Sequence, residues 1–237
     1  MGKNLIQQAR GKGSPRYRAP SFRYKGESKY ARSDGKILTG KIIDLVHSQG
    51  HSAPLAEIEY ENGSKILLQA PEGIRVGDKV EMGKDVEVKN GNVMPLMNIP
   101  EGISIYNIEA SPGDGGKFVR SSGVSAKIIT KMQNRIMVEM PSSKRKFFLP
   151  DCRATIGIIA GGGRKEKPFL KAGTRYYAMK AKNKLWPQVS GTSMNSVDHP
   201  FGGSSSSVKG GPTQASRNDP PGRKVGKIAP KRTGKKR

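Results

Sequence analysis

The chain has 237 residues, with 43 lysines and arginines against 19 acidic residues and a formal net charge of +24. Apolar residues make up 34% of it, below the globular norm of about 45–50%, and no run approaches the roughly twenty apolar residues of a membrane-spanning helix. The single cysteine, Cys152, excludes an intrachain disulfide, and the three histidines show no metal-ligand spacing.

The positive charge is concentrated in three segments. Residues 1–36 hold ten basic and two acidic side chains, residues 160–190 eight and one, and residues 200–237 ten and one. Residues 37–159 are nearly balanced, with fifteen basic and fourteen acidic side chains. Lysine and arginine arms displace the counterions condensed on phosphates, so this layout predicts a nucleic-acid partner. Solvated charged tails are the alternative.

Residues 1–36 are predicted to form a basic N-terminal arm. The segments 16–18 (Arg-Tyr-Arg) and 22–25 (Phe-Arg-Tyr-Lys) interleave cations with aromatic rings. Such pairs hold phosphates while the rings stack on exposed bases, which argues against plain solvated tails. No apolar segment of the signal-peptide kind follows Met1, so we expect a cytoplasmic protein.

A first small β-barrel is predicted over residues 37–92, because β-rich runs recur at roughly ten-residue spacing without a helical period. Gly40 is expected to mark a bulge or bend, and Asn62-Gly63 predicts a hairpin turn. Residues 37–110 hold six basic and eleven acidic groups, a charge that repels phosphate. The expected strands cover residues 36–46, 55–60, 65–69, 73–80 and 85–88.

A second, SH3-like barrel is predicted over residues 93–160. The glycine-rich segment 111–116 is expected to be a tight loop, and residues 132–134 are expected to turn a hairpin. Residues 111–159 hold nine basic and three acidic groups, so this module is suited to touching phosphates. The expected strands cover residues 103–108, 125–130, 135–140, 146–149 and 154–159.

Residues 161–237 are predicted to form a basic C-terminal extension rich in Gly, Ser and Pro. Its start, Gly161 to Lys165, lacks the spacing of a nucleotide-binding loop. Three glycines beside Arg164 let backbone N–H groups approach a phosphate, and a flexible linker is the alternative. One short helix is expected over residues 172–184, and no usable periodicity follows Ser190.

Several motifs together closely resemble the family of the universal second protein of the large ribosomal subunit. The most specific is the signature Gly-Thr-Ser-Met-Asn-Ser-Val-Asp-His-Pro-Phe-Gly-Gly at residues 191–203. Residues 217–226 and 231–234 resemble the archaeal and eukaryotic branch. The sequence departs from many relatives at Ser196 and at Phe201, where many bacterial members have a second histidine. Further matching segments are residues 18–20, 91–96, 99–100, 107–109, 111–116, 152–157 and 160–164.

The resemblance implies a mainly β fold, with an oligonucleotide-binding-type barrel followed by an SH3-like barrel and long irregular basic extensions. It implies a structural constituent of the large ribosomal subunit in the cytoplasm. Such a protein binds ribosomal RNA near the peptidyl-transferase region and supports subunit association and tRNA binding. The implied partners are that RNA, neighbouring large-subunit proteins and the small subunit at a bridge. No membrane, homo-oligomer or protein-bound cofactor is expected, since structural Mg²⁺ or K⁺ would be held by the RNA.

The predicted ribosomal-RNA contacts share a basic, aromatic or polar side chain in an extension, in the second module or in the signature. Trp186 is predicted to stack on a base or, alternatively, to anchor the tail. The full set is Arg10, Arg16, Arg18, Arg23, Lys117, Arg120, Arg164, Lys165, Lys171, Arg175, Lys184, Trp186, Asn195, Asp198, His199, Lys209, Arg217, Arg223, Lys224 and Arg232.

Two other classes compete with a structural RNA-binding protein. An enzyme would use His199 as a general acid or base, with Asp198 or Ser193 assisting. Adjacent residues rarely face each other, and the flanking Pro200 and glycines indicate a pinned turn, so we expect His199 to bind RNA or pack in that turn. A DNA-compacting protein is the other alternative, and preference for folded RNA over duplex DNA separates the two.

Overall fold

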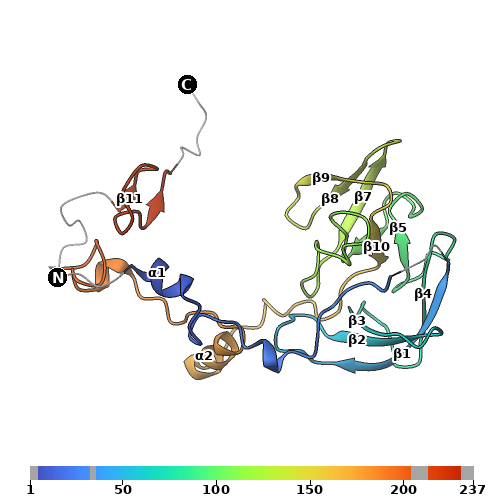
Figure 1. Cartoon of the computed structure of the whole chain (residues 1–237), viewed down its shortest axis with the longest axis horizontal. Coiled ribbons are helices and arrows are strands. Elements are labelled where there is room, and N and C mark those ends of the chain that lie inside the picture. Colours follow the sequence, from blue (N-terminus) through green and yellow to red (C-terminus); the bar gives the residue numbers. More distant parts are fainter. Residues whose placement is uncertain (1–4, 33–35, 204–212, 231–237) are drawn as a thin grey trace. The chain divides into compact units, whose positions relative to one another are not determined.

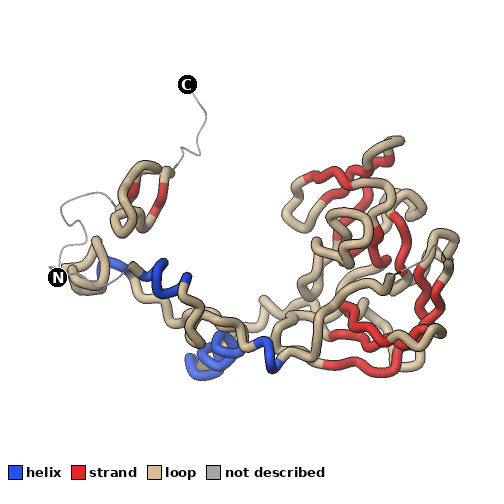
Figure 2. The backbone as a smooth tube through the Cα atoms, in the orientation of Figure 1, coloured by secondary structure: helices blue, strands red, loops and turns tan. Residues whose placement is uncertain are grey.

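The computed structural model describes residues 5–32, 36–203 and 213–230. The chain divides into two compact units (Figure 1). One consists of residues 21–170 and contains the β modules; we call it the body. The other, which we call the extension unit, combines residues 1–20 with residues 171–237. The regular structure of the body is almost entirely strand, and irregular backbone dominates the extension unit (Figure 2).

The body is mainly β, as predicted, with one short 3₁₀ turn, η1 (Ser21–Arg23). Its strands are hydrogen-bonded in the order β3-β2-β1-β4-β5-β10-β6-β7-β8-β9. All neighbouring pairs are antiparallel except β4 and β5, which pair in parallel. The strands are β1 (Leu38–Val46), β2 (Leu55–Tyr60), β3 (Lys65–Gln69), β4 (Lys79–Met82), β5 (Val93–Pro95), β6 (Ser104–Tyr106), β7 (Ala126–Lys131), β8 (Ile136–Glu139), β9 (Arg145–Phe148) and β10 (Arg153–Ile156).

Both predicted hairpins are confirmed. Strands β2 and β3 pair across the turn at Gly63, which has φ +76°, and β7 pairs with β8. Of the predicted bulge or bend at Gly40, the bulge is absent, because the register of Gly40 with both neighbouring strands is regular; the register shift in β1 lies between Ile42 and Asp44. A Cβ at Gly40 would lie 2.9 Å from the Tyr60 ring. The glycine therefore makes room for a buried ring.

Two of the predicted strands are placed wrongly. Residues 73–78 form turns and irregular backbone, and the strand begins only at Lys79. Gly73 and Gly77 have φ values of +81° and +97°, a backbone conformation incompatible with an extended strand. Residues 85–88 form no strand either, and the next strand along the chain is β5.

The body has two hydrophobic cores, and β5 lies at their junction. Val93 packs in the core that contains Ile42, Ile58 and Val80. Its neighbour Met94 packs in the other core, with residues of the second module. Successive side chains on a strand point to opposite faces, so one strand serves both modules at the position where the sequence predicts their boundary.

The predicted N-terminal arm ends inside the body. Ser28, Tyr30 and Ala31 are buried, although residues 1–36 were assigned to an extension. The Tyr30 hydroxyl donates to the Asn107 carbonyl oxygen at 2.7 Å and lies 2.7 Å from Thr155 Oγ1. These partners belong to the second module, whereas the Tyr30 side chain also packs in the first core. Residues 28–31 therefore connect the two modules.

An ion pair between Glu109 and Arg153 completes this junction. Glu109 is fully buried and Arg153 is 14% exposed. Glu109 Oε1 accepts from Arg153 Nη2 at 2.8 Å and from Nε at 3.1 Å, and it also accepts from the Gly115 amide. Glu109 Oε2 accepts from the Arg153 amide, and Arg153 Nη1 donates to the Ala31 carbonyl oxygen at 2.9 Å. The pair therefore links residues 28–31, β10 and the glycine-rich loop of residues 111–116, which we call the glycine loop.

Three buried tyrosines predict loss of stability in alkaline solution. Burial raises the pKa values of Tyr30 and Tyr106 well above the usual 10, and that of Tyr60 to about 12. A raised folded pKa stabilises the body below pH 10, and this contribution is lost as the pH rises above that value. We expect the free energy of unfolding to fall by about 1.4 kcal/mol per pH unit for each tyrosine. Urea unfolding between pH 8 and 11 measures it, and a flat profile contradicts it.

The extension unit has little regular structure. Helix α1 (Ile6–Gly11) was not predicted, and helix α2 (Ala172–Ala181) ends three residues before the predicted Lys184. Asn183 has φ +50°; its amide donates to the Lys180 carbonyl oxygen at 3.1 Å, and the Lys184 amide to that of Met179 at 2.9 Å. This is a Schellman cap, which stops the helix. The remaining elements are the 3₁₀ turn η2 (Gly191–Ser193) and the parallel strands β11 (Gln214–Ala215) and β12 (Lys227–Ile228).

Candidate nucleic-acid interface

The predicted contacts before residue 37 are all exposed. In the extension unit these are Arg10, in the last turn of α1, together with Arg16 and Arg18. In the body, the guanidinium of Arg23 lies 5.3 Å from the centroid of the exposed Phe22 ring. A cation beside an open aromatic face is suited to a phosphate and an adjacent base.

Lys117 and Arg120 follow the glycine loop of the second module, but their side chains differ in exposure to solvent. Lys117 is exposed. Arg120 is partly buried, and it donates to the carbonyl oxygens of Gly116 at 3.1 Å and Ser28 at 2.8 Å. Burial also lowers its pKa. Arg120 therefore holds residues 28–31 against the loop, whereas the sequence suggested a contact with RNA.

The glycine-rich start of the C-terminal extension is packed against the body. A Cβ on Gly123 would lie 2.5 Å from Gly162 Cα, so the two backbones touch. Arg164 is exposed, and its Nε donates to Ser122 Oγ at 3.1 Å. Lys165 next to it is exposed as well. These contacts favour an ordered segment, with two exposed cations, and argue against the alternative of a flexible linker.

The contacts predicted around α2 form one basic and aromatic group. Lys171 precedes the helix, and Arg175 lies on it with its guanidinium 5.4 Å from the Trp186 ring centroid. Trp186 is partly buried, and Lys184 is exposed. Because Trp186 is neither fully open nor buried, both predicted roles remain: base stacking and anchoring of the tail.

The signature loop holds His199 in a fixed turn. The His199 amide donates to the Asn195 carbonyl oxygen at 3.2 Å, and the Phe201 amide donates to His199 Nδ1 at 3.0 Å. The two rings lie 4.8 Å apart between centroids. A Cβ on Gly191 would overlap the imidazole, which explains a glycine at the start of this signature. Asn195 and Asp198 are exposed on the same turn.

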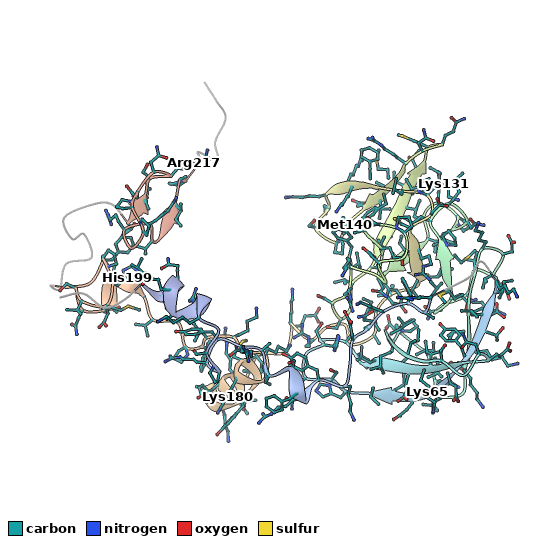
Figure 3. The ribbon with its side chains drawn as sticks, in the orientation of Figure 1. Lys65, Lys131, Met140, Lys180, His199 and Arg217 are labelled. Carbon is teal, nitrogen blue, oxygen red and sulfur yellow. The ribbon has the colours of Figure 1, made fainter. Side chains whose placement is uncertain are left out.

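The end of the extension unit is organised by two short strands. Phe201 packs over Gly226, next to β12, and Ala215 on β11 is buried. Arg217 follows β11 and is exposed, whereas Arg223 and Lys224 precede β12 and are partly buried (Figure 3 labels Arg217). Two predicted contacts, Lys209 and Arg232, lie outside the described residues.

Other basic and aromatic side chains were missed in the sequence. Strand β9 is an edge of the sheet and carries Arg145 and Lys146 after Lys144, all exposed. Lys146 Nζ lies 3.5 Å from the Phe118 ring centroid. The signal was visible as three consecutive cations inside a β pattern. Tyr177, on α2, is also exposed and was not predicted.

The described part of the chain holds no group of three or more His, Cys, Asp or Glu side chains placed to bind a metal ion. None of its helices is long and apolar enough to cross a membrane. The exposed side chains of the basic segments include many cations and several aromatic rings, whereas residues 37–159 carry acidic and basic groups in near balance.

Comparison with known proteins agrees with these features. The profile described as Ribosomal Proteins L2, C-terminal domain, matches residues 89–224. The large ribosomal subunit protein uL2 of Methanococcoides burtonii is 54% identical over 237 residues, covering 100% of both chains. That of Methanocaldococcus jannaschii is 55% identical, covering 99% of both. That of Haloarcula marismortui is 49% identical, covering 99% of this chain and 98% of its own. The chain therefore belongs to the L2 family of ribosomal proteins, of the archaeal type.

Proposed function

We propose that this protein is a structural constituent of the large ribosomal subunit and binds ribosomal RNA through the cations of its extensions. The observation that carries the proposal is the likeness to uL2 proteins at about half identity over the full length of the chain. The exposed cations Arg10, Arg16, Arg18 and Arg164 support it. Cationic side chains on irregular segments can lie along closely spaced phosphates of the RNA. Their binding releases the counterions condensed on those phosphates.

The mechanism is a division of labour between the body and the extensions. The two β modules form the rigid part of the protein, because the junction at Tyr30, Glu109 and Arg153 keeps them in one arrangement. Phosphate contacts then position the protein without reading the sequence of the RNA. Arg120 serves the junction, so we do not include it among the phosphate contacts.

We further propose the finer roles that the family implies. These are a position near the peptidyl-transferase region, support of subunit association and tRNA binding, and a bridge to the small subunit. The proposed partners are large-subunit RNA and neighbouring ribosomal proteins, in the cytoplasm. A protein built into one RNA site needs no self-association, and the RNA phosphates are the natural ligands for structural Mg²⁺ or K⁺.

We propose a structural role for His199 and no catalytic activity for the chain. When Nδ1 accepts the Phe201 amide hydrogen, the proton of a neutral imidazole is on Nε2. Nε2–H is then a hydrogen-bond donor suited to a phosphate or hydroxyl oxygen of RNA. A general base acting through Nε2 requires the other tautomer.

Replacing His199 by alanine is expected to leave single-turnover peptidyl transfer in assembled subunits within a few-fold of wild type. The substitution removes one hydrogen bond and the ring contact with Phe201, neither of which is a step of the reaction. Rates are compared in subunits matched for assembly and tRNA binding. A total loss of transfer, with assembly and tRNA binding intact, would establish the catalytic alternative.

Sedimentation of native lysate through a high-salt gradient tests the proposed function. We expect the chain to migrate with large subunits at salt that strips loosely bound factors. Release into the light fractions identifies a dissociable RNA-binding factor instead. A known integral large-subunit protein and a known dissociable factor, followed in the same gradient, calibrate the two outcomes.

A further inference from the structure

Helix α2 has few sources of stability within the protein. It is ten residues long, none of its residues is buried, and its N-terminal cap residue, Lys171, makes no side-chain capping bond. Isolated helices shorter than about 12–15 residues are marginal in water. The Schellman cap at Asn183 defines where the helix ends. The helix is therefore well suited to packing against something outside the chain.

The side chains of α2 form alternating contacts between cations and rings. Arg175 lies over Trp186, and Lys180 Nζ lies 6.0 Å from the centroid of the Tyr176 ring (Figure 3 labels Lys180 on α2). Tyr176 and Tyr177 meet edge to face, with their centroids 5.5 Å apart. Tyr177 is 70% exposed and Tyr176 is 43% exposed. Most of Tyr177 is therefore open to the outside, beside the Tyr176 ring.

The charge around the helix selects the kind of partner. Residues 167–197 contain six lysines and arginines and no acidic residue. A protein partner would need acidic side chains to pair with these cations. Those carboxylates would then also lie against the exposed tyrosine rings, which is an unfavourable contact. An unpaired nucleotide meets both features, because it joins an anionic phosphate to an apolar base with a π face.

We propose that α2 and Trp186 form a binding site for an unstacked nucleobase and its flanking phosphates, with Tyr177 as the stacking ring and Arg175 and Lys180 as the phosphate contacts. The inference rests on the proposed RNA-binding function and adds a base-stacking site to it. A bulged or looped nucleotide, whose base is free of its own helix, is the matching ligand. Trp186 is the only tryptophan in the chain, so its emission reports binding at this site.

Two RNA hairpins test the site in the full-length chain. One carries a single bulged adenosine, and the other carries an abasic nucleotide at the same position, so they share every phosphate. We expect the adenosine hairpin to bind about 5- to 150-fold more tightly, the range for one stacked base, and to change Trp186 emission more than the abasic hairpin does. Tyr177→Ala abolishes this preference and Tyr177→Phe retains it.

The control is Phe147→Ala, which removes a 48% exposed ring from β9 in the body; it leaves the preference unchanged. Equal binding of the two hairpins by wild type overturns the base site, and so does a preference that survives in Tyr177→Ala. Both results leave the proposed function intact if binding stays salt-dependent. Failure of wild type to bind either hairpin at low salt contradicts RNA binding by the extensions themselves.

Discussion

Replacing Glu109 by glutamine is expected to lower the free energy of unfolding of the body by about 3–5 kcal/mol, the cost of breaking a buried ion pair at one partner. Glu109 is fully buried and accepts four hydrogen bonds, three from Arg153 and one from the Gly115 amide. Glutamine leaves the guanidinium without a counter-charge and turns an NH₂ group toward donors. The effect combines an uncompensated charge with lost hydrogen bonds.

Urea unfolding followed by far-UV circular dichroism measures this change. Glu59→Gln is the matched control, since Glu59 forms an exposed ion pair with Lys65 at 3.4 Å, and a loss of at most about 1 kcal/mol is expected there. The double variant Glu109→Leu, Arg153→Met removes both charges and is expected to recover much of the stability. A Glu109→Gln protein as stable as Glu59→Gln would show that the pair does not hold the modules together.

The affinity of the full-length chain for large-subunit ribosomal RNA is expected to fall steeply with salt. For about ten engaged phosphates, log Kobs against log salt has a slope near −7 to −9. Substituting Arg16, Arg18 and Arg164 with glutamine is expected to reduce the magnitude of that slope by about 2–3, because each lost phosphate contact removes 0.7–0.9. Filter binding between 50 and 400 mM salt measures both slopes.

The matched control removes three exposed lysines from the acidic first module, Lys41, Lys79 and Lys84. It changes the net charge by the same amount but is expected to leave the slope unchanged, which separates local contacts from overall charge. A wild-type slope near −3 would contradict binding driven by the extensions. Equal affinity for duplex DNA at moderate salt would favour the DNA-compacting alternative.

Local patterns in the sequence were enough to predict most of the strands and both hairpins. Asn62-Gly63 set a turn between two short apolar runs, and the structure pairs them. The prediction failed over residues 73–78 and 85–88, where apolar residues alternate with glycines and charges. Gly73 and Gly77 adopt left-handed backbone there, a choice that the pattern of apolar residues does not encode.

The sequence by itself determined the segregation of charge, the two β modules and the family, since each depends on patterns among residues that are close together in the chain. The tertiary structure alone decided which polar groups face inward. Tyr30 bonds Thr155 across 125 residues, Arg120 reaches Ser28 across 92, and Arg153 meets Glu109 across 44. The sequence around an arginine in a basic stretch does not distinguish a side chain that contacts RNA from one that donates to a buried carbonyl oxygen. Only the fold brings those carbonyls within reach, because burial without a partner would cost more than exposure.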